Sequence, residues 1–125
     1  KAPLTIVKEF HKGESIGYNR LYVVEEGESI AFIQAGYADG IPISFSNVGQ
    51  VDIGKNLFTI VGKVSMDMVA IRCTNKEIKV GQDAVFWGND NEDLRLEILS
   101  QKFKKIPYEF LTGVTKRVKR IYINE

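Results

Sequence analysis

The chain has 125 residues, 44% of them hydrophobic, which is enough to form one core without stabilisation by a disulfide or a metal. Its 17 basic and 16 acidic side chains leave a formal charge of +1, which argues against nucleic acid as the main partner, because phosphate backbones bind concentrated basic faces. One cysteine, Cys73, excludes an internal disulfide and favours a reducing compartment, and one histidine, His11, argues against a histidine-based metal site.

Short apolar segments separated by turns dominate the first 90 residues. The run at 29–35 is almost continuously apolar, which is typical of a strand buried on both faces. The segments 51–53 and 57–61 flank a short glycine-containing loop and predict a hairpin. The other strands are expected at residues 4–7, 21–24, 68–73, 84–87 and 118–123. Strands of this length and spacing predict a mainly β fold, a barrel or a sandwich.

One or two short helices are expected near the carboxy terminus. Leu96, Leu99 and Phe103 are spaced to form a single stripe on a helix, and the acidic run 91–93 would cap its start. Pro107 would open a second short helix through residue 111. The basic side chains of the last third, Arg117 among them, are interpreted as a solvated helix face and a charged edge strand.

Three tyrosines lie beside a glycine or a proline: Tyr18, Tyr37 and Tyr108. A tyrosine within a strand usually packs in the core, whereas one in a glycine-bounded loop can be held against a ligand. By spacing alone, Met66 would be core filler.

Four motifs resemble those of the alanine racemase family and occur along the chain in the family's order. They are Gly-Tyr-Ala-Asp-Gly at 36–40, Val-Gly-Lys-Val-Ser-Met-Asp-Met at 61–68, Lys-Gly-Glu-Ser-Ile-Gly-Tyr at 12–18, and the ending at 107–114 with 117–122. Each motif is weak alone, but together they span nearly the whole chain. The resemblance is to the carboxy-terminal domain of a fold-type III pyridoxal-phosphate racemase.

The resemblance implies that residues 1–125 form a closed six-stranded Greek-key barrel cut from a longer polypeptide. In the family, an amino-terminal α/β barrel binds pyridoxal phosphate through a lysine that this chain lacks, and two subunits pair head to tail. The complete enzyme is expected to be cytoplasmic and to supply D-alanine for peptidoglycan. The isolated chain is expected to be inactive.

The resemblance also assigns roles. Tyr18 matches the catalytic tyrosine, which is lent to the partner subunit's active site. Tyr108 matches the tyrosine that hydrogen-bonds the cofactor phosphate. Met66 matches the residue whose backbone N–H binds the substrate carboxylate, and Tyr37 matches the tyrosine at the substrate entrance. No metal is expected.

Two departures concern the entrance. The segment 41–44 lacks an arginine that many members carry there, and Ser65 stands where cysteine is common. Substrate preference therefore stays open among alanine, serine, lysine and a broad range of amino acids. A free-standing interaction module without activity is the alternative from another class, and a metal- or nucleic-acid-binding barrel is a more distant one.

Overall fold

The structure, a computed structural model, describes residues 2–9, 15–16, 22–23, 29–73, 78–88, 91–105 and 107–118. Six strands form one antiparallel sheet in the order β5-β6-β7-β4-β1-β8. The strands are β1 (Ala2–Glu9), β4 (Ser29–Ile33), β5 (Gln50–Ile53), β6 (Asn56–Val61), β7 (Val69–Arg72) and β8 (Asp83–Ala84). A separate pair joins β2 (Ser15–Ile16) to β3 (Tyr22–Val23).

The sheet is open, so the predicted closed barrel is not confirmed. Its two outermost strands approach each other through one isolated bridge, in which Asp52 and Val85 exchange two backbone hydrogen bonds of 2.9 Å. The expected strand 84–87 is shorter than predicted, since β8 ends at Ala84. Beyond Val85 the chain packs aromatic rings instead: Phe86 is buried, and Trp87 meets Phe110 edge-on at 5.5 Å. Phe86 therefore packs in the core and Trp87 against α2, and neither residue extends the hydrogen bonding of β8.

The hairpin of β5 and β6 is confirmed. Ile53 pairs with Asn56, which leaves a two-residue turn of Gly54 and Lys55 with φ of 59° and 69°. Two central residues with positive φ match the right-handed twist of the flanking strands. Asp52 stabilises the turn by accepting the Lys55 N–H at 2.9 Å.

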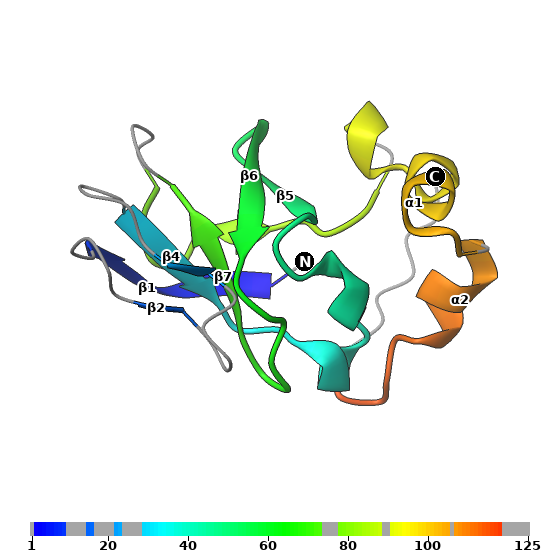
Figure 1. Cartoon of the computed structure of the whole chain (residues 1–125), viewed down its shortest axis with the longest axis horizontal. Coiled ribbons are helices and arrows are strands. Elements are labelled where there is room, and N and C mark those ends of the chain that lie inside the picture. The colour runs from blue at the N-terminus through cyan, green and yellow to red at the C-terminus, as the bar shows by residue number, and fades with distance from the viewer. Residues whose placement is uncertain are drawn as a thin grey trace.

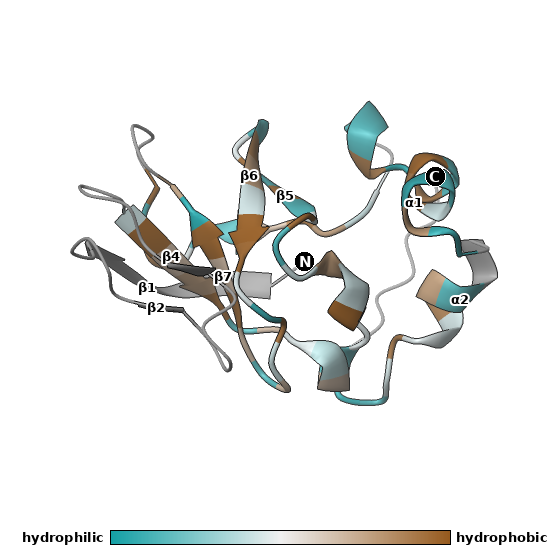
Figure 2. Cartoon of the chain, viewed as in Figure 1, coloured by the Kyte–Doolittle hydropathy of each residue, from teal (hydrophilic) through white to brown (hydrophobic). Residues whose placement is uncertain are grey.

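Both faces of β4 are buried, as its continuous apolar run predicts. Ala31 and Ile33 belong to the main core, whereas Ile30 packs with Val61 and Ala70 on the other face. Figure 2 shows the hydrophobic segments concentrated on β4, β6 and β7.

The two short helices are confirmed: α1 (Leu96–Phe103) and α2 (Pro107–Thr112). Figure 1 places them at one end of the molecule and β1, β4 and β7 at the other, with the β5–β6 hairpin between. Leu99 is buried, and Phe103 stacks on Phe45 with ring centroids 4.4 Å apart. Phe45 belongs to the 3-10 turn η3 (Ile43–Phe45) and also faces Phe110 of α2 at 6.1 Å, so one ring joins both helices to the core.

The predicted cap of α1 is wrong in detail. Asn91 accepts the Asp93 N–H at 3.0 Å and caps a separate 3-10 turn, η4 (Glu92–Leu94), whereas α1 starts after Arg95 without a side-chain cap. The acidic run therefore caps a turn that precedes α1.

Two loops distant in sequence leave the sheet at the same end. β4 ends beside the start of β7, with Ile33 opposite Val69, and residues 62–68 connect β6 to that start. The loop after β4 contains the 3-10 turn η2 (Tyr37–Asp39). It lies against residues 62–68 through two backbone hydrogen bonds, from Tyr37 N–H to Ser65 O at 2.9 Å and from Ala38 N–H to Met66 O at 3.1 Å.

The close contact between these loops requires glycine at position 36. A Cβ atom there would lie 2.1 Å from Ser65 O and 2.5 Å from the carbonyl atoms of Met66. Gly36 has φ of −151°, which any residue adopts, so the requirement is steric.

Cys73 is expected to be unreactive. Its side chain is 3% exposed in the core, and burial raises the pKa of the thiol, so the reactive thiolate is scarce at neutral pH. Iodoacetamide should label the native chain slowly and the urea-unfolded chain fully, as read by intact mass. Rapid stoichiometric labelling of the native protein would contradict the burial.

Gly36→Ala is expected to destabilise the chain by about 1–3 kcal/mol, because the new methyl group forces the two loops apart. Thermal and urea unfolding measure the effect. Gly88→Ala is the matched control, since a Cβ there meets only Val85 Cγ1 at 3.7 Å, an ordinary contact. Equal stability of the two variants would show that the loops separate freely.

Candidate functional site

Tyr37 and Met66 lie side by side on the surface at the junction of the two loops. The two residues are 44% and 50% exposed, while backbone hydrogen bonds between the loops hold their main chains in place. Met66 and Asp67 occupy the tip of a turn that Ser65 closes, since Ser65 Oγ donates to Met68 O at 2.8 Å and accepts the Met68 N–H at 3.1 Å. The structure thus brings together two of the four residues predicted for the site.

The Met66 N–H has a defined direction. It belongs to the same peptide unit as Ser65 O, and in a trans peptide the C=O and N–H point in opposite directions. Because Ser65 O accepts from Tyr37 N–H, the Met66 N–H points away from the Gly36–Tyr37 backbone. Within the described ranges, no protein acceptor pairs with it. It is therefore a fixed donor beside an exposed tyrosine.

A three-residue ion bridge spans the same two loops. Arg117 Nε lies 3.3 Å from Asp39 Oδ1, and Arg117 Nη2 donates to Asp67 Oδ1 at 2.9 Å. The other oxygen of Asp39, Oδ2, accepts the Gly36 N–H at 3.0 Å. The hydrogen bond to Asp67, followed by the negative charge of Asp39, raises the pKa of Arg117, so the guanidinium stays charged.

The segment 113–118 that carries Arg117 is itself attached to the loop of Tyr37. Thr115 Oγ1 donates to Ala38 O at 2.6 Å and accepts the Arg117 N–H at 3.4 Å. Gly40, with φ of 108°, passes so near Gly113 that a Cβ would lie 2.7 Å from its carbonyl oxygen. Three chain segments therefore meet at one point.

The loop of Met66 is anchored from a further side. Gly62 and Asn47 exchange hydrogen bonds, with Gly62 N–H donating to Asn47 Oδ1 at 2.6 Å and Asn47 N–H donating to Gly62 O at 3.2 Å. Val64 N–H donates to Ser46 Oγ at 2.9 Å. The loop is fixed at both ends, which is how a backbone donor is preorganised.

The two remaining predicted residues, Tyr18 and Tyr108, have side chains that the structure does not describe. Tyr108 lies in the first turn of α2, and its backbone follows the helix. Tyr18 lies outside the described residues. Their assigned roles stay predictions.

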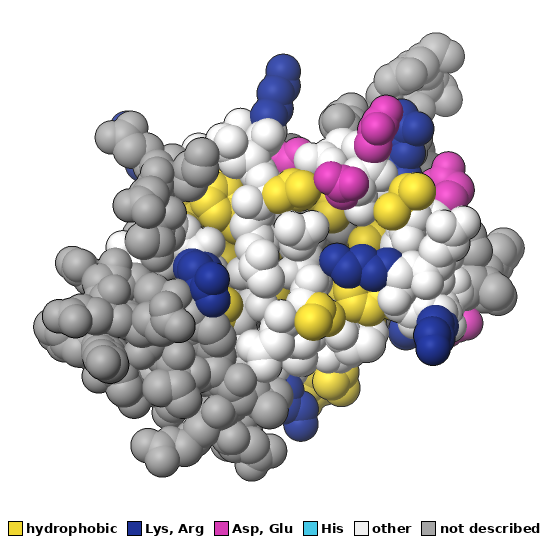
Figure 3. All heavy atoms as spheres, turned by 45° about the horizontal axis from the view of Figure 1, so that its top comes forward, with side chains coloured by type: hydrophobic (Ala, Val, Ile, Leu, Met, Phe, Trp, Pro, Cys, Tyr) yellow, Lys and Arg dark blue, Asp and Glu magenta, His cyan; other side chains and the backbone are white. Residues whose placement is uncertain are grey.

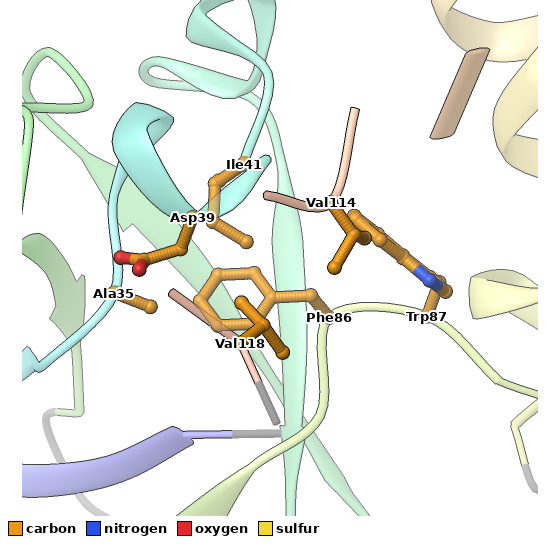
Figure 4. Close-up of a pocket in the computed structure, with 7 residues that line it drawn as sticks. All are labelled: Ala35, Asp39, Ile41, Phe86, Trp87, Val114 and Val118. Atoms are coloured by element: carbon orange, nitrogen blue, oxygen red, sulfur yellow. The ribbon is translucent and has the colours of Figure 1, made fainter. Parts of the chain in front are cut away.

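A hollow of about 180 Å³ lies behind the loop of Tyr37. Figure 4 shows Ile41 and Phe86 facing it and the Asp39 carboxylate turned to the side of Ala35. Asp39 is the only charged group of the described lining. The hollow is smaller than the roughly 300 Å³ at which ordinary ligand pockets begin, and we interpret it as a packing gap.

Neither a cluster of metal ligands nor a membrane-spanning helix is found among the described residues. No three His, Cys, Asp or Glu side chains in the described ranges gather as metal ligands would. Among the same residues, no helix has the length and apolarity to span a bilayer. On the face shown in Figure 3, apolar side chains form separate spots among polar and charged ones.

The sequence-based interpretation missed Asp39, Asp67 and Arg117. The sequence predicts a solvated basic surface around Arg117, and the structure shows that its half-exposed guanidinium also pairs with Asp39 and Asp67. A signal was present, because each aspartate lies within two residues of a predicted site residue. The sequence does not show that one arginine, Arg117, pairs with both aspartates.

Comparison with known proteins identifies the family. Residues 1–122 match the family model described as alanine racemase, C-terminal domain. The chain is 35% identical over 117 residues to an alanine racemase of Vesicomyosocius okutanii, covering 94% of this chain and 33% of that protein. Over 121 residues it is 36% identical to the alanine racemase of Aliivibrio salmonicida, covering 96% and 33%.

Solved structures agree. The alanine racemase of Streptomyces lavendulae superposes with a TM-score of 0.89 at 30% identity, over 98% of this chain and 32% of that one. The enzyme of Bartonella henselae, with covalently bound pyridoxal phosphate, gives 0.88 at 32% identity, over 97% and 33%. The chain thus spans about a third of the length of these relatives. It belongs to the alanine racemase family, as a carboxy-terminal domain.

Proposed function

We propose that this chain is the carboxy-terminal third of a pyridoxal-phosphate-dependent alanine racemase and supplies part of the substrate site. The observation that carries the proposal is the Met66 N–H, which is fixed in direction, lies beside the exposed Tyr37 and has no acceptor among the described residues. A backbone N–H held in place is a suitable donor for a carboxylate, and every amino-acid substrate has one. Family membership supplies the reaction type.

In this mechanism Met66 N–H orients the substrate through its carboxylate, and Tyr37 lines the entrance. Tyr18 takes or returns the α-proton on one face of the substrate, and a lysine of the missing barrel acts on the other. Racemisation needs two such groups because the proton leaves one face and returns to the opposite one. An ordinary phenol has a pKa of about 10, so Tyr18 requires a charged neighbour from that barrel to act at neutral pH.

The residues of this chain fit a supporting role toward the cofactor. The hollow behind the Tyr37 loop is small and mostly apolar, so it does not suit a phosphorylated ring. Tyr108 of α2 would hold the phosphate by its hydroxyl, and pyridoxal phosphate, when bound, would supply the electron sink. The head-to-tail homodimer, the barrel domain, the closed six-stranded β-barrel, the cytoplasmic location and the supply of D-alanine for peptidoglycan belong to this proposal.

Substrate choice is the finer part of the proposal. The segment 41–44 lacks the arginine that many family members carry near there, and its Ile43 is 49% exposed. We propose alanine as the substrate, and L-serine and L-lysine should be assayed beside it. Reading the gene upstream of Lys1 gives the first test, because a barrel with a cofactor lysine is expected there.

Tyr18→Phe in the complete enzyme is expected to slow racemisation by about 10²–10⁴-fold, because it removes the hydroxyl that transfers one proton. Deuterium incorporation from each alanine enantiomer should show the block on one face only, with cofactor absorbance unchanged. As a control, Tyr22→Phe removes the hydroxyl of another tyrosine, in β3, and should leave the racemisation rate unchanged. A wild-type rate in Tyr18→Phe would refute the assignment.

The isolated 125-residue chain should neither racemise alanine nor form an imine absorption band with pyridoxal phosphate.

Tyr108→Phe is expected to weaken cofactor affinity by roughly ten- to a hundred-fold, as loss of a hydrogen bond to a charged acceptor predicts. Turnover at saturating cofactor should change much less. Titration of the apoenzyme with pyridoxal phosphate measures the dissociation constant. An unchanged constant would show that the Tyr108 hydroxyl does not reach the phosphate.

A further inference from the structure

Among the described residues, Arg117 joins both loops of the proposed site through side chains. It contacts Asp39, two residues after Tyr37, and Asp67, directly after Met66. It reaches both from a third segment, the turn that follows α2. None of these three charged groups has a part in the proposed proton transfer or cofactor contact.

We propose that Arg117 is a positioning residue that sets the Tyr37 loop and the Met66 loop in register and so aims the Met66 N–H at the substrate carboxylate. This inference rests on the proposed function for its substrate and on the structure for its geometry. The connection is continuous: Gly36 N–H binds Asp39, Asp39 pairs with Arg117, and Arg117 binds Asp67.

Stability alone does not account for this bridge. The Arg117 and Asp67 side chains are 50% and 60% exposed, and ion pairs this open to water contribute little to folding. Asp39 is different, because its side chain is 15% exposed and its second oxygen is committed to the backbone of Gly36. The bridge therefore connects a rigid anchor to the exposed tip of the Met66 turn.

Loss of that connection would leave backbone hydrogen bonds to hold the Ser65–Met66 peptide against the Tyr37 loop without the side-chain link at Asp67. Tyr37 N–H and Ala38 N–H hold Ser65 O and Met66 O from one side, but Asp67 follows at the tip, where Arg117 supplies the side-chain restraint. A small change in the tip redirects the Met66 N–H and so weakens its hydrogen bond to the substrate carboxylate.

The geometry calls for arginine. Two different nitrogens of one planar guanidinium, Nε and Nη2, contact two separate carboxylates. A lysine ammonium is a single point charge and lacks this fork. The guanidinium also offsets one of two negative charges that would otherwise lie beside a proposed anion site.

The test uses Arg117→Gln in the complete enzyme, with Lys116→Gln as the matched control. Lys116 is the neighbouring exposed cation and forms no ion pair with the described residues, so its variant has the same charge change without the bridge. We expect Arg117→Gln to raise KM for L-alanine by roughly ten- to a hundred-fold, the range for a lost hydrogen bond to a charged acceptor. The kcat should change much less, and the control should leave both unchanged.

Two further variants separate position from charge. The KM of Arg117→Lys should lie between those of the wild type and Arg117→Gln. A KM equal to that of the wild type would overturn the positioning role. Asp67→Asn should raise KM in the same direction, and adding it to Arg117→Gln should cost little more, because both remove one connection. Fully additive effects would also overturn the proposal.

Amide hydrogen exchange supplies a readout that does not depend on racemisation. The Tyr37 and Ala38 amides, which donate to the Met66 loop, should exchange faster in Arg117→Gln than in Lys116→Gln. Unchanged exchange overturns the inference, even if racemisation is confirmed. A wild-type protein that racemises no amino acid refutes the proposed function, while faster exchange in the variant still establishes that Arg117 sets the register.

Discussion

The hydrogen bond from Tyr37 N–H to Ser65 O is the contact on which the site depends. It closes the gap between a loop that leaves β4 and a loop that connects β6 to β7. It also fixes a peptide unit, and so gives the next N–H its direction. Gly36 permits the contact because it has no side chain to keep the backbones apart.

Sheet topology makes this contact possible. Antiparallel pairing puts the end of β4 beside the start of β7, and the chain enters β7 from the turn that carries Met66. Two motifs about 30 residues apart in sequence therefore emerge at one edge. The turn after α2 reaches the same edge and adds Arg117. The site is thus built from backbone that the sheet has already positioned, with charged side chains as its outer restraint.

Much of the fold was predictable from local patterns. The hairpin follows from its glycine-containing loop, the burial of β4 from its apolar run, and α1 from the spacing of Leu96, Leu99 and Phe103. Features set by tertiary packing were not. β8 is short because Phe86 and Trp87 pack against other elements, and Asn91 caps a turn ahead of α1. Barrel closure is not confirmed either, since among the described residues β5 meets the chain just beyond β8 through the isolated Asp52–Val85 bridge.

The candidate site divides in the same way. Motif resemblance singled out Tyr37 and Met66, and the exposure of both agrees with a role at a surface. The Asp39–Arg117–Asp67 bridge was beyond reach, because residues 78 and 50 positions apart meet there only after folding. The partner of a charged side chain in such a bridge therefore depends on the tertiary structure.

The aromatic contact between Trp87 and Phe110 has an optical consequence. Trp87 is the only tryptophan in the chain, and its indole ring lies edge-on to a buried ring of α2. Its fluorescence therefore reports on the docking of α2, the helix that carries Tyr108, without any attached dye. An emission shift to longer wavelength would mark exposure of the indole to water when that helix separates from it.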